Sequence, residues 1–385
     1  MSDPIDAAVR RATFAQCGPT ATVLITGVGS LVGAGILDAL AGRRQNLHIV
    51  GTSFGAQAPA VFRCDEAYLT PPSDDPAFGG RIAEVIGLVR PDVVIPGRDP
   101  DIDILAALDL APERVMVGTA AAAELCADKL LLSRFAVEHD LPAVPTRSAA
   151  EGPIAIPAIA KPRRGSGSLG VRVVVTERQM AASLGDPGIV LQPLLGPLPE
   201  LPDPTAGWPL FYCPPTARLG GVQGIIGPKG DLLAAAAFET HQVIGRVEGQ
   251  WLTDDPDLAE VGRLWLDGMA EAGWRGPLNV ATIHDGARWL GLELNGRFTG
   301  GTTSRLACGF DEVGIALNHW LGREVVPPME RLDNDVRAVM QPVARAVSSA
   351  ASGRFARDGR WLAADGHAAA GGWTSQFTGR PAQGA

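Results

Sequence analysis

Three side chains that can bind metal and phosphate alternate along one apolar stretch of the chain. Glu293, Asn295 and Arg297 are separated by single residues, and side chains two apart on a strand point to the same side. A carboxylate and an amide oxygen on one face suit Mg²⁺, which is usually held by one or two carboxylates together with nucleotide phosphates. The spacing therefore predicts a metal site, and Arg297 extends it with a fixed positive charge.

A second stretch combines a lysine with a glycine-rich loop. Lys161 ends an apolar run, and the segment 162–170 that follows contains three glycines and two serines. Such a loop can bring several backbone N–H groups onto phosphate oxygens. A flexible surface hairpin with a solvated lysine would explain this segment alone about equally well. Taken together with the metal-binding face, the loop indicates an enzyme that uses a nucleotide.

Composition narrows the class of protein. A chain of 385 residues with 46% hydrophobic residues is long enough for two or three packed units. The formal charge of −9 argues against a nucleic-acid surface, and the sequence lacks a run of about 18 apolar residues that would predict a membrane span. The five cysteines have no Cys-x-x-Cys spacing, which excludes the usual zinc pattern. Because the N-terminus has no signal-peptide pattern, the expected compartment is a reducing cytoplasm.

The elements that position these residues can be predicted from hydrophobic patterning. In the first third of the chain, short apolar runs alternate with helical patterns, which predicts a parallel α/β sheet that ends near residue 118. The strands are expected at 21–26, 47–51 and 91–96, with helices that end at residue 40 and span 81–90 and 104–110. Arg98, Asp99 and Asp101 follow the last strand at the edge where ligands of such sheets collect, although a solvated loop explains them equally well.

The rest of the chain shows strand patterns around the two chemical stretches. We expect helices at 120–139, 258–272 and 311–321, and strands at 154–160, 171–175, 189–192, 221–226, 232–239, 277–283 and 288–294. The Asp-Gly pair between the last two strands is a strong hairpin signal. The proline-rich segment 193–215 predicts a long irregular loop. Residues 345–385 are rich in Ala, Gly and Arg, which predicts a weakly ordered tail with at most a hairpin.

A second nucleotide pattern competes with this interpretation. Gly27, Gly29 and Gly33 follow the first predicted strand, but a dinucleotide fingerprint needs its third glycine where Val32 stands. That fingerprint also needs an acidic residue at the end of the second strand, and the segment 51–53 contains none. A tight strand-to-helix turn explains the glycines better. A nicotinamide-dependent oxidoreductase is therefore the weaker hypothesis.

Four features occur in one order along the chain. They are the N-terminal α/β pattern, a helix that opens at Asp128, the Lys161 loop, and a hairpin that carries Asn279 and the 293–297 motif Glu-Leu-Asn-Gly-Arg. This ordered set resembles the ATP-grasp superfamily, and within it the carbamoyl-phosphate-synthase-like ligases, over roughly residues 21–325. The resemblance implies an α/β and α+β fold, in which a Rossmann-like pre-ATP-grasp domain precedes a two-subdomain ATP-grasp fold.

The resemblance also implies domain boundaries and partners. The expected units are an N-terminal lead-in at 1–20, the pre-ATP-grasp domain at 21–118, the lid subdomain at 119–190, the C-terminal subdomain with the metal site at 191–326, and an Ala/Gly-rich extension at 327–385. The partners would be small-molecule carboxylate and amine substrates, not nucleic acid or a membrane. A homodimer is also expected, because the family is often dimeric.

In such a fold, ATP would lie between the two subdomains. Lys129 and Lys161 would hold its phosphates beneath the glycine loop, and Glu200 in the proline-rich segment is a candidate for the ribose hydroxyls. The other nucleotide contacts that the resemblance implies are Gly165, Ser166, Gly167 and Ser168 in the loop, and Gln192, Pro193, Leu194 and Leu195 in a hinge beside the adenine.

The same resemblance implies a reaction. A substrate carboxylate would attack the γ-phosphate and become an acyl phosphate, which an amine or another nucleophile would then convert to product with loss of phosphate. Arg297 and Lys161 would stabilise the transferred phosphoryl group, and Arg305 would help to bind the carboxylate. Catalysis of this kind is positioning plus neutralisation of charge. The implied ligands of Mg²⁺, or of Mn²⁺ in its place, are Glu293, Asn295 and Asn279.

Two positions depart from the family pattern. The strand before the metal motif usually offers Gln, Asp or Glu two residues after an Asn, and here that position holds Ala281, which cannot bind metal. Gly296 stands where the family usually has Pro, and it allows a different backbone angle beside the metal site. These departures leave a second hypothesis open, in which the chain binds ATP in a non-catalytic or regulatory role.

Overall fold

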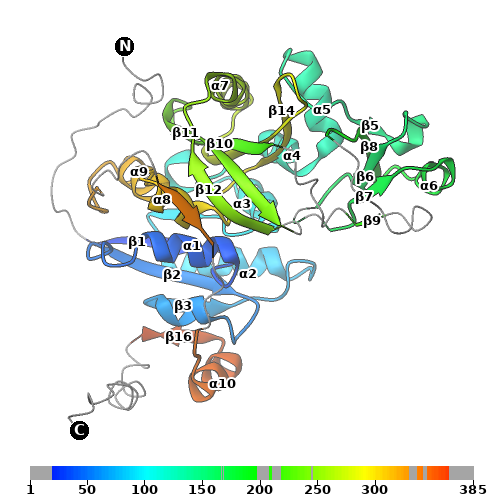
Figure 1. Ribbon diagram of the computed structural model, residues 1–385. Coiled ribbons are helices and arrows are strands. Elements are labelled where there is room, and N and C mark those ends of the chain that lie inside the picture. The colour runs from blue at the N-terminus through cyan, green and yellow to red at the C-terminus, as the bar shows by residue number, and fades with distance from the viewer. Residues whose placement is uncertain are drawn as a thin grey trace, which may run out of the picture.

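Three β-sheets with helices packed around them make up the molecule (Figure 1). The computed structural model describes residues 20–165, 167, 169–196, 208–209, 218–243, 246–328, 336–340 and 345–363. The first sheet holds the N-terminal strands, the second is a small sheet within residues 147–209, and the third is a large sheet within residues 219–339. The mixed α/β class predicted from the sequence is therefore confirmed.

Four parallel strands form most of the first sheet, whose order is β16-β3-β2-β1-β4. Their sequences are almost wholly apolar because helices cover both faces of the sheet. The strands are β1 (Ala21–Ile25), β2 (Leu47–Ser53), β3 (Glu66–Leu69) and β4 (Val93–Ile95). The helices of this unit are α1 (Leu31–Ala39), α2 (Phe78–Val89) and α3 (Asp99–Ala107), with 3-10 turns η2 (Pro59–Arg63) and η3 (Pro112–Arg114).

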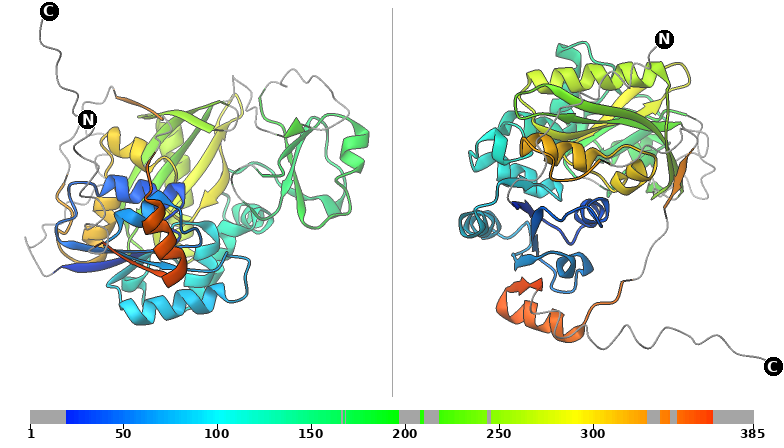
Figure 2. Two further views of the ribbon diagram at one scale, coloured as in Figure 1. Left: turned by 90° about the horizontal axis from the view of Figure 1, so that it is seen from below. Right: turned by 90° about the vertical axis from the view of Figure 1, so that its left-hand side faces the viewer.

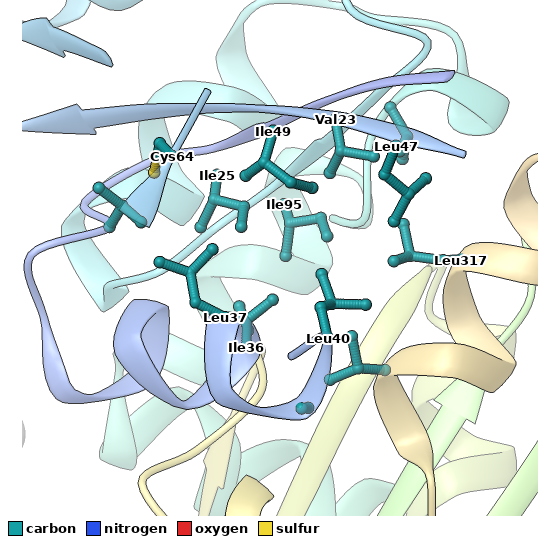
Figure 3. Close-up of a cluster of buried hydrophobic side chains, with 14 of the residues drawn as sticks. Val23, Ile25, Ile36, Leu37, Leu40, Leu47, Ile49, Cys64, Ile95 and Leu317 are labelled. Atoms are coloured by element: carbon teal, nitrogen blue, oxygen red, sulfur yellow. The ribbon is translucent and has the colours of Figure 1, made fainter. Parts of the chain in front are cut away.

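The two faces of this sheet bury different neighbours. Ile25, Ile49 and Ile95 point to one side, where they meet Ile36 of α1 and Leu317 of α9 (Glu312–Trp320) (Figure 3). The alternate residues of the same strands face the other side and pack on α2 and α3. Because α9 belongs to the C-terminal half of the chain, the first sheet shares its core with the part of the molecule that carries the metal motif.

Residues 349–362 complete the first sheet at its outer edge. α10 (Ser349–Asp358) leads into β16 (Arg360–Leu362), which pairs antiparallel with β3. Phe355 and Trp361 are buried and contact Phe62 edge-on. The expectation of a weakly ordered tail is therefore wrong for this segment, because two aromatic side chains bury enough apolar surface to dock an otherwise Ala- and Gly-rich stretch.

The second sheet stands apart from the rest of the molecule (Figure 2). Its order is β5-β8-β6-β7-β9, and its small core is made mainly of Ala, Val and Leu side chains. We call it the lid sheet. Its elements are β5 (Arg147–Ser148), η4 (Ala149–Glu151), β6 (Ala158–Pro162), β7 (Arg172–Val174), α6 (Glu177–Ala181), β8 (Ile189–Pro193) and β9 (Trp208–Pro209).

Two helices link the first sheet to the lid sheet, α4 (Ala120–Ala127) and α5 (Lys129–Glu138). The single helix predicted over 120–139 is broken between them at Asp128. The carboxylate of Asp128 accepts hydrogen bonds from the backbone N–H groups of Leu130 and Leu131, so it acts as the N-cap of a new helix. This cap fixes Lys129 as the first residue of α5.

The third sheet is antiparallel, in the order β14-β13-β10-β11-β12-β15, and helices cover both of its faces. Helix α7 packs on one face, while α8 and α9 lie between the sheet and the N-terminal unit (Figure 2). The strands are β10 (Leu219–Ile226), β11 (Leu232–Val243), β12 (Arg246–Leu252), β13 (Gly276–His284), β14 (Trp289–Asn295) and β15 (Arg337–Val339). The two helices not yet given bounds are α7 (Pro256–Glu271) and α8 (Thr302–Ala307).

Hydrophobic patterning missed several of these elements. β3 has only four residues, and β12 carries Gly249 and polar residues that break its apolar alternation. The helix expected at 104–110 begins instead at Asp99. Within the described ranges, none of the helices has the length and apolar character needed to cross a membrane. The lead-in up to residue 19, most of the proline-rich loop, and residues 364–385 lie outside the part of the chain that the structure describes.

Candidate active site

A cavity of about 840 Å³ lies between the lid sheet and the large sheet. Its walls come from β6 and β8 on the lid side, from β10 to β14 on the other side, and from parts of α1, α5 and α8. This volume is typical of a site for a small organic ligand. Of the predicted nucleotide and metal residues within the described ranges, the cavity wall includes Lys129, Lys161, Gly165, Gly167, Gln192, Pro193, Leu194, Leu195, Asn279, Glu293 and Asn295.

Lys161 is a buried cation in the cavity wall. It ends the apolar part of β6, and only 5% of it is exposed. The pKa of its ammonium group is lowered to about 8, mainly by burial; the Glu293 carboxylate opposes the shift, and the charge of Lys129 adds to it. Lys161 therefore carries a charge at neutral pH that the surrounding protein compensates only in part. An anionic ligand would stabilise that charge.

The glycine loop is tied to the start of α5. Lys129 Nζ donates to the carbonyl of Gly165 at 2.7 Å. The neighbouring Asp128 accepts from Arg163 Nε at 2.7 Å, and the Lys129 N–H donates to the Arg163 carbonyl. Burial alone would raise the pKa of Asp128, but the hydrogen bonds from Arg163 and from the α5 backbone hold it below its usual value. A negative charge thus anchors the loop beside two lysines.

The three residues predicted to bind metal lie on two neighbouring strands and line the cavity. Asn279 of β13 lies opposite Asn295 of β14, and Ala281 lies opposite Glu293. Asn279 is 6% exposed, and its Nδ2 has no hydrogen-bond partner among the described residues. One carboxylate and two amides fit Mg²⁺, which accepts few protein ligands and keeps several waters. The described residues contain no cluster of three or more acidic, His or Cys side chains that could hold a metal by themselves.

The position of the missing metal ligand is next to an aromatic ring. Gly221 of β10 pairs with Ala281 on one side and with Phe238 of β11 on the other. A Cβ at position 221 would lie 3.0 Å from Cζ of Phe238, so the ring extends over Gly221 toward Ala281. An apolar ring beside an alanine offers no ligand to a second cation.

Arg297 makes its main contact across the domain boundary. Its Nε and Nη2 donate to the two carboxylate oxygens of Asp99 at 2.7 Å each, and Asp99 is the first residue of α3 in the N-terminal unit. Nη2 also reaches Asn295 Oδ1 at 3.3 Å. The guanidinium therefore supports a predicted metal ligand from behind. The only sequence signal for this pair is the position of Asp99 after the end of a predicted strand.

Arg305 forms a buried ion pair. Its Nη2 donates to Glu312 Oε1 at 2.7 Å and its Nε to Glu312 Oε2 at 3.2 Å, and each side chain is 1% exposed. The guanidinium also lies over the ring of Phe238, with its carbon 5.0 Å from the ring centroid. Arg305 lines the cavity, as the prediction for a substrate-binding residue requires. Sequence analysis did not find Glu312, because it is an ordinary first-turn glutamate of α9.

The predicted hinge lies along one wall. Gln192 is 3% exposed, and its Nε2 donates to Thr146 Oγ1 at 2.7 Å. Its side chain is therefore engaged within the lid sheet, and Pro193, Leu194 and Leu195 line the cavity after it. Three predicted nucleotide contacts, Ser166, Ser168 and Glu200, lie outside the described residues.

The glycines after β1 form a tight turn. The Ser30 side chain caps α1 by accepting from the Gly33 N–H, and a Cβ at position 33 would lie 2.6 Å from the backbone of Val28. Gly33 is thus explained by the close approach of helix and turn. The end of β2 consists of Gly51, Thr52 and Ser53 and has no acidic side chain. The turn and this strand therefore do not support a nicotinamide-dependent oxidoreductase.

Comparison with solved structures identifies the fold. The biotin carboxylase domain of 2-oxoglutarate carboxylase from Hydrogenobacter thermophilus, solved as a dimer with MgADP, ADP and bicarbonate, matches with a TM-score of 0.58 and 16% identity over 82% of this chain and 71% of its own. N5-carboxyaminoimidazole synthetase from Staphylococcus aureus with ADP matches at 0.59 and 13% identity, covering 83% and 80%. The corresponding ribonucleotide synthetase from Thermus thermophilus matches at 0.59 and 20%, covering 80% and 79%.

These similarities show that the chain has the ATP-grasp fold, as the ordered motifs predicted. No family model and no curated protein sequence matches the chain. At identities of 20% or below, the comparisons speak to the fold alone. The function of the site is therefore inferred from its residues.

Proposed function

We propose that the protein is an ATP-dependent ligase that activates a substrate carboxylate as an acyl phosphate for attack by an amine or another nucleophile. One observation carries the proposal. A single cavity brings together the buried Lys161, Lys129 and the Glu293 carboxylate, with Asn279 and Asn295 beside it. Cations for phosphate and oxygens for a divalent metal, held between two sheets, are what a nucleotide-using phosphoryl transfer needs.

ATP would occupy the wall that the lid sheet provides. Lys129 and Lys161 would hold its phosphates, while the glycine loop lies over them through Gly165 and Gly167. Residues 192–195 would form the hinge beside the adenine. The similar structures from Hydrogenobacter thermophilus and Staphylococcus aureus were solved with ADP, which supports a nucleotide in this protein as well.

Glu293, Asn295 and Asn279 would hold Mg²⁺, or Mn²⁺ in its place. When bound, such an ion neutralises charge on the β- and γ-phosphate oxygens. The protein's own part is to hold the donor oxygens in place. Asn295 is supported by Arg297, which is in turn fixed by Asp99.

The chemical step would transfer the γ-phosphoryl group to carbon-bound oxygen. A carboxylate oxygen attacks the γ-phosphorus, the bond to the β-phosphate oxygen breaks, and ADP leaves. The amine nitrogen then attacks the acyl carbon, and phosphate and a proton leave. Lys161 would compensate the charge that builds on the transferred group. Because Glu312 already neutralises Arg305, we assign Arg305 to the substrate end of the cavity and do not give it the reacting carboxylate.

We assign residues 21–118 to a Rossmann-like pre-ATP-grasp domain, 119–190 to the lid, and 191–326 to the subdomain with the metal site, as predicted from the sequence. The boundary at residue 190 needs one change, because β8 and β9 pair within the lid sheet and so extend the lid beyond it. Segment 327–385 contributes β15 to the large sheet and α10 and β16 to the first domain. We further propose small-molecule carboxylate and amine partners, a cytoplasmic location, and a homodimer, which the dimeric biotin carboxylase domain supports by analogy.

A second candidate function is ATP binding without catalysis. It is favoured by Ala281 and by the ring of Phe238 beside it, which together remove one metal ligand of the family pattern. In this case, the protein would bind nucleotide and respond to it without forming ADP.

Release of ADP and phosphate from ATP·Mg²⁺ tests the proposal directly. The protein would be mixed with a panel of amines and carboxylic acids, and products would be identified by mass spectrometry. Substrate-dependent ADP release with a product of condensed mass is expected, and Lys161→Ala should abolish it. Lys229→Ala, at an exposed turn, is the matched control and should leave it unchanged. Nucleotide binding without turnover in any mixture would favour the second candidate.

A further inference from the structure

The floor of the cavity runs across the large sheet and has two ends. Glu293 lies on β14 and Gln250 on β12, with β13, β10 and β11 between them. At the usual spacing of neighbouring strands, this separation is roughly 19 Å. The Glu293 end carries the proposed metal and phosphate site. The Gln250 end has no part in that site.

Gln250 is an unsatisfied amide at this second end. It is 2% exposed, it lines the cavity, and its Oε1 has no hydrogen-bond partner among the described residues. Its cross-strand neighbour Thr240 donates instead to the carbonyl of Leu219. Leaving a buried acceptor without a partner is unfavourable, and no described residue donates a hydrogen bond to this one.

Arg305 supplies an unused donor next to this acceptor. Its Nε and Nη2 are taken up by Glu312 and by the hydroxyls of Thr299 and Thr302. No described residue accepts a hydrogen bond from Nη1. A Cβ at position 301 would lie 2.7 Å from Arg305 Nη1 and 2.7 Å from Gln250 Oε1. Both atoms therefore border the space beside the bare backbone of Gly301, and they lie no more than twice that distance apart.

The charge of this end selects the kind of group that fits. Arg305 and Glu312 are equally buried and neutralise one another. A ligand carboxylate would add a negative charge that no buried cation is free to balance, and buried unbalanced charge is strongly unfavourable. A group that is uncharged, accepts one hydrogen bond and donates another would satisfy both atoms.

We infer that the end of the cavity formed by Gln250, Gly301 and Arg305 binds a carboxamide group carried by a substrate of the enzyme. The amide oxygen accepts from Arg305 Nη1, and the amide N–H donates to Gln250 Oε1. We call this the amide subsite. The claim that the amide belongs to a substrate rests on the proposed ligase function, whereas the preference of the subsite for an amide does not.

Binding of matched probes tests the amide subsite without any turnover. Calorimetry would compare asparagine with aspartate and succinamate with succinate, because each pair differs only in an amide against a carboxylate. The amide member should bind about tenfold tighter or more, because a polar site discriminates strongly against a group that leaves its partners unpaired. Equal binding within both pairs, or tighter binding of the carboxylates, would overturn the inference.

Gln250→Met removes the orphan acceptor at nearly constant shape. The amide preference should fall to within about twofold of unity, while the affinity for ADP stays within twofold. The melting temperature should be unchanged or higher, since an unpaired buried amide is lost, whereas a merely structural glutamine would give a lower one. Gln45→Met, at an exposed position, is the matched control. An amide preference that survives Gln250→Met would show that the probes bind elsewhere, and a preference absent from the wild type would mean that the two atoms bind water only.

Gly301→Ala tests the same subsite from the backbone side. The added methyl group would stand between Gln250 and Arg305 and should abolish probe binding with ADP affinity retained. The outcomes also separate this inference from the proposed function. Amide binding without ADP release in any mixture would leave the subsite intact and contradict the ligase, whereas ADP release without amide preference would contradict the subsite alone.

Discussion

The two ends of the cavity differ in whether a buried cation has a full counter-charge. At one end, Lys161 is buried without a full counter-charge, so that its pKa falls to about 8 even though Glu293 opposes the shift. At the other end, Arg305 is just as buried but shares two hydrogen bonds with Glu312. The first end needs an anion to stabilise it, and the second is already neutral. The difference indicates where a phosphate belongs and where an uncharged polar group belongs.

This comparison gives different meanings to residues of similar type. A buried cation is usually interpreted as a ligand-binding residue, and the resemblance implied a catalytic role for Lys161, Arg297 and Arg305 alike. The structure pairs both arginines with carboxylates, Arg297 with Asp99 and Arg305 with Glu312. We expect a catalytic role where a buried cation has no full counter-charge, and a supporting role where a carboxylate already neutralises it.

The largest expected effect is at the charged end. Lys161→Ala and Glu293→Ala should each lower the rate of ADP release by about 10²- to 10³-fold, because each removes charge stabilisation of the transferred phosphoryl group. Neither variant should have a lower melting temperature, since neither residue is needed to complete the core, and Lys161→Ala removes the cost of burying that charge. A large loss of folding in either variant would show that the residue is structural and would contradict the assignment of this end.

At the neutral end, the expected effect is on stability. Glu312→Ala should lower the free energy of unfolding by about 3–5 kcal/mol, because it leaves Arg305 buried without a counter-charge. Chemical denaturation would measure it. The double variant Arg305→Met, Glu312→Leu is the control and should recover most of the loss. If Glu312→Ala were as stable as the wild type, Glu312 would not be the counter-charge that stabilises the buried Arg305.

The Asp99–Arg297 pair should have an intermediate effect on catalysis. Asp99→Asn weakens the bidentate contact that holds Arg297 behind Asn295, so kcat should fall about tenfold through loss of positioning while KM for ATP changes less than twofold. Stability should change by less than about 1 kcal/mol, because Asp99 is partly exposed. Asp103→Asn on the same helix is the matched control. An unchanged kcat would show that the pair only joins the two units.

The lowered pKa of Lys161 also predicts a pH dependence of nucleotide binding. Because the charged form of Lys161 binds phosphate, affinity for ADP should be constant below about pH 8 and should fall above it, by up to about tenfold per pH unit. Titration calorimetry between pH 6.5 and 9.5, roughly bracketing that pKa, would measure the change. In Glu293→Gln the onset should move to lower pH, because the carboxylate that raises the Lys161 pKa is gone. In Lys161→Arg, the affinity for ADP should not begin to fall near pH 8.

The lowered pKa of Lys161 also affects folding, where stability rises with pH while nucleotide affinity falls. The pKa of Lys161 is lowered from its ordinary 10.5 to about 8 in the folded protein, so the unfolded chain binds the proton more tightly. This group therefore opposes folding fully below pH 8, and its contribution to stability improves as the pH rises from 8 toward 10.5. Lys161→Met should remove this rise, which a comparison of unfolding curves across that range would detect.

The sequence predicted the metal face and missed its supports. Glu293 and Asn295 could be predicted from their alternation and Asn279 from the order of the motifs, whereas the β-bulge beside Ala281 that sets it opposite Glu293 could not. Asp99 and Glu312 could not be found in this way. Asp99 is 198 residues from its partner Arg297, and a contact between remote segments leaves no local pattern.

The same limit applies to the neutral end of the cavity. Gln250 lies on β12, whose glycine and polar cavity-facing residues hide the strand alternation. Its place in the cavity wall also involves Arg305 of α8, which is more than 50 residues away in the sequence. The short strand β3 and the docked segment around Trp361 were missed for a similar reason, because their stability comes from tertiary packing and not from local propensity.

The pairing of β16 with β3 has a consequence during protein synthesis. A ribosome adds about 5–20 residues per second, so the edge of β3 stays uncovered for roughly 15–60 s before Arg360 emerges to pair with it. An open strand edge invites pairing with other nascent chains. β3 limits that hazard by its length of four residues and by Glu66, whose charge is later met by Arg360. The first sheet is thus completed only after the lid sheet and the large sheet have been translated.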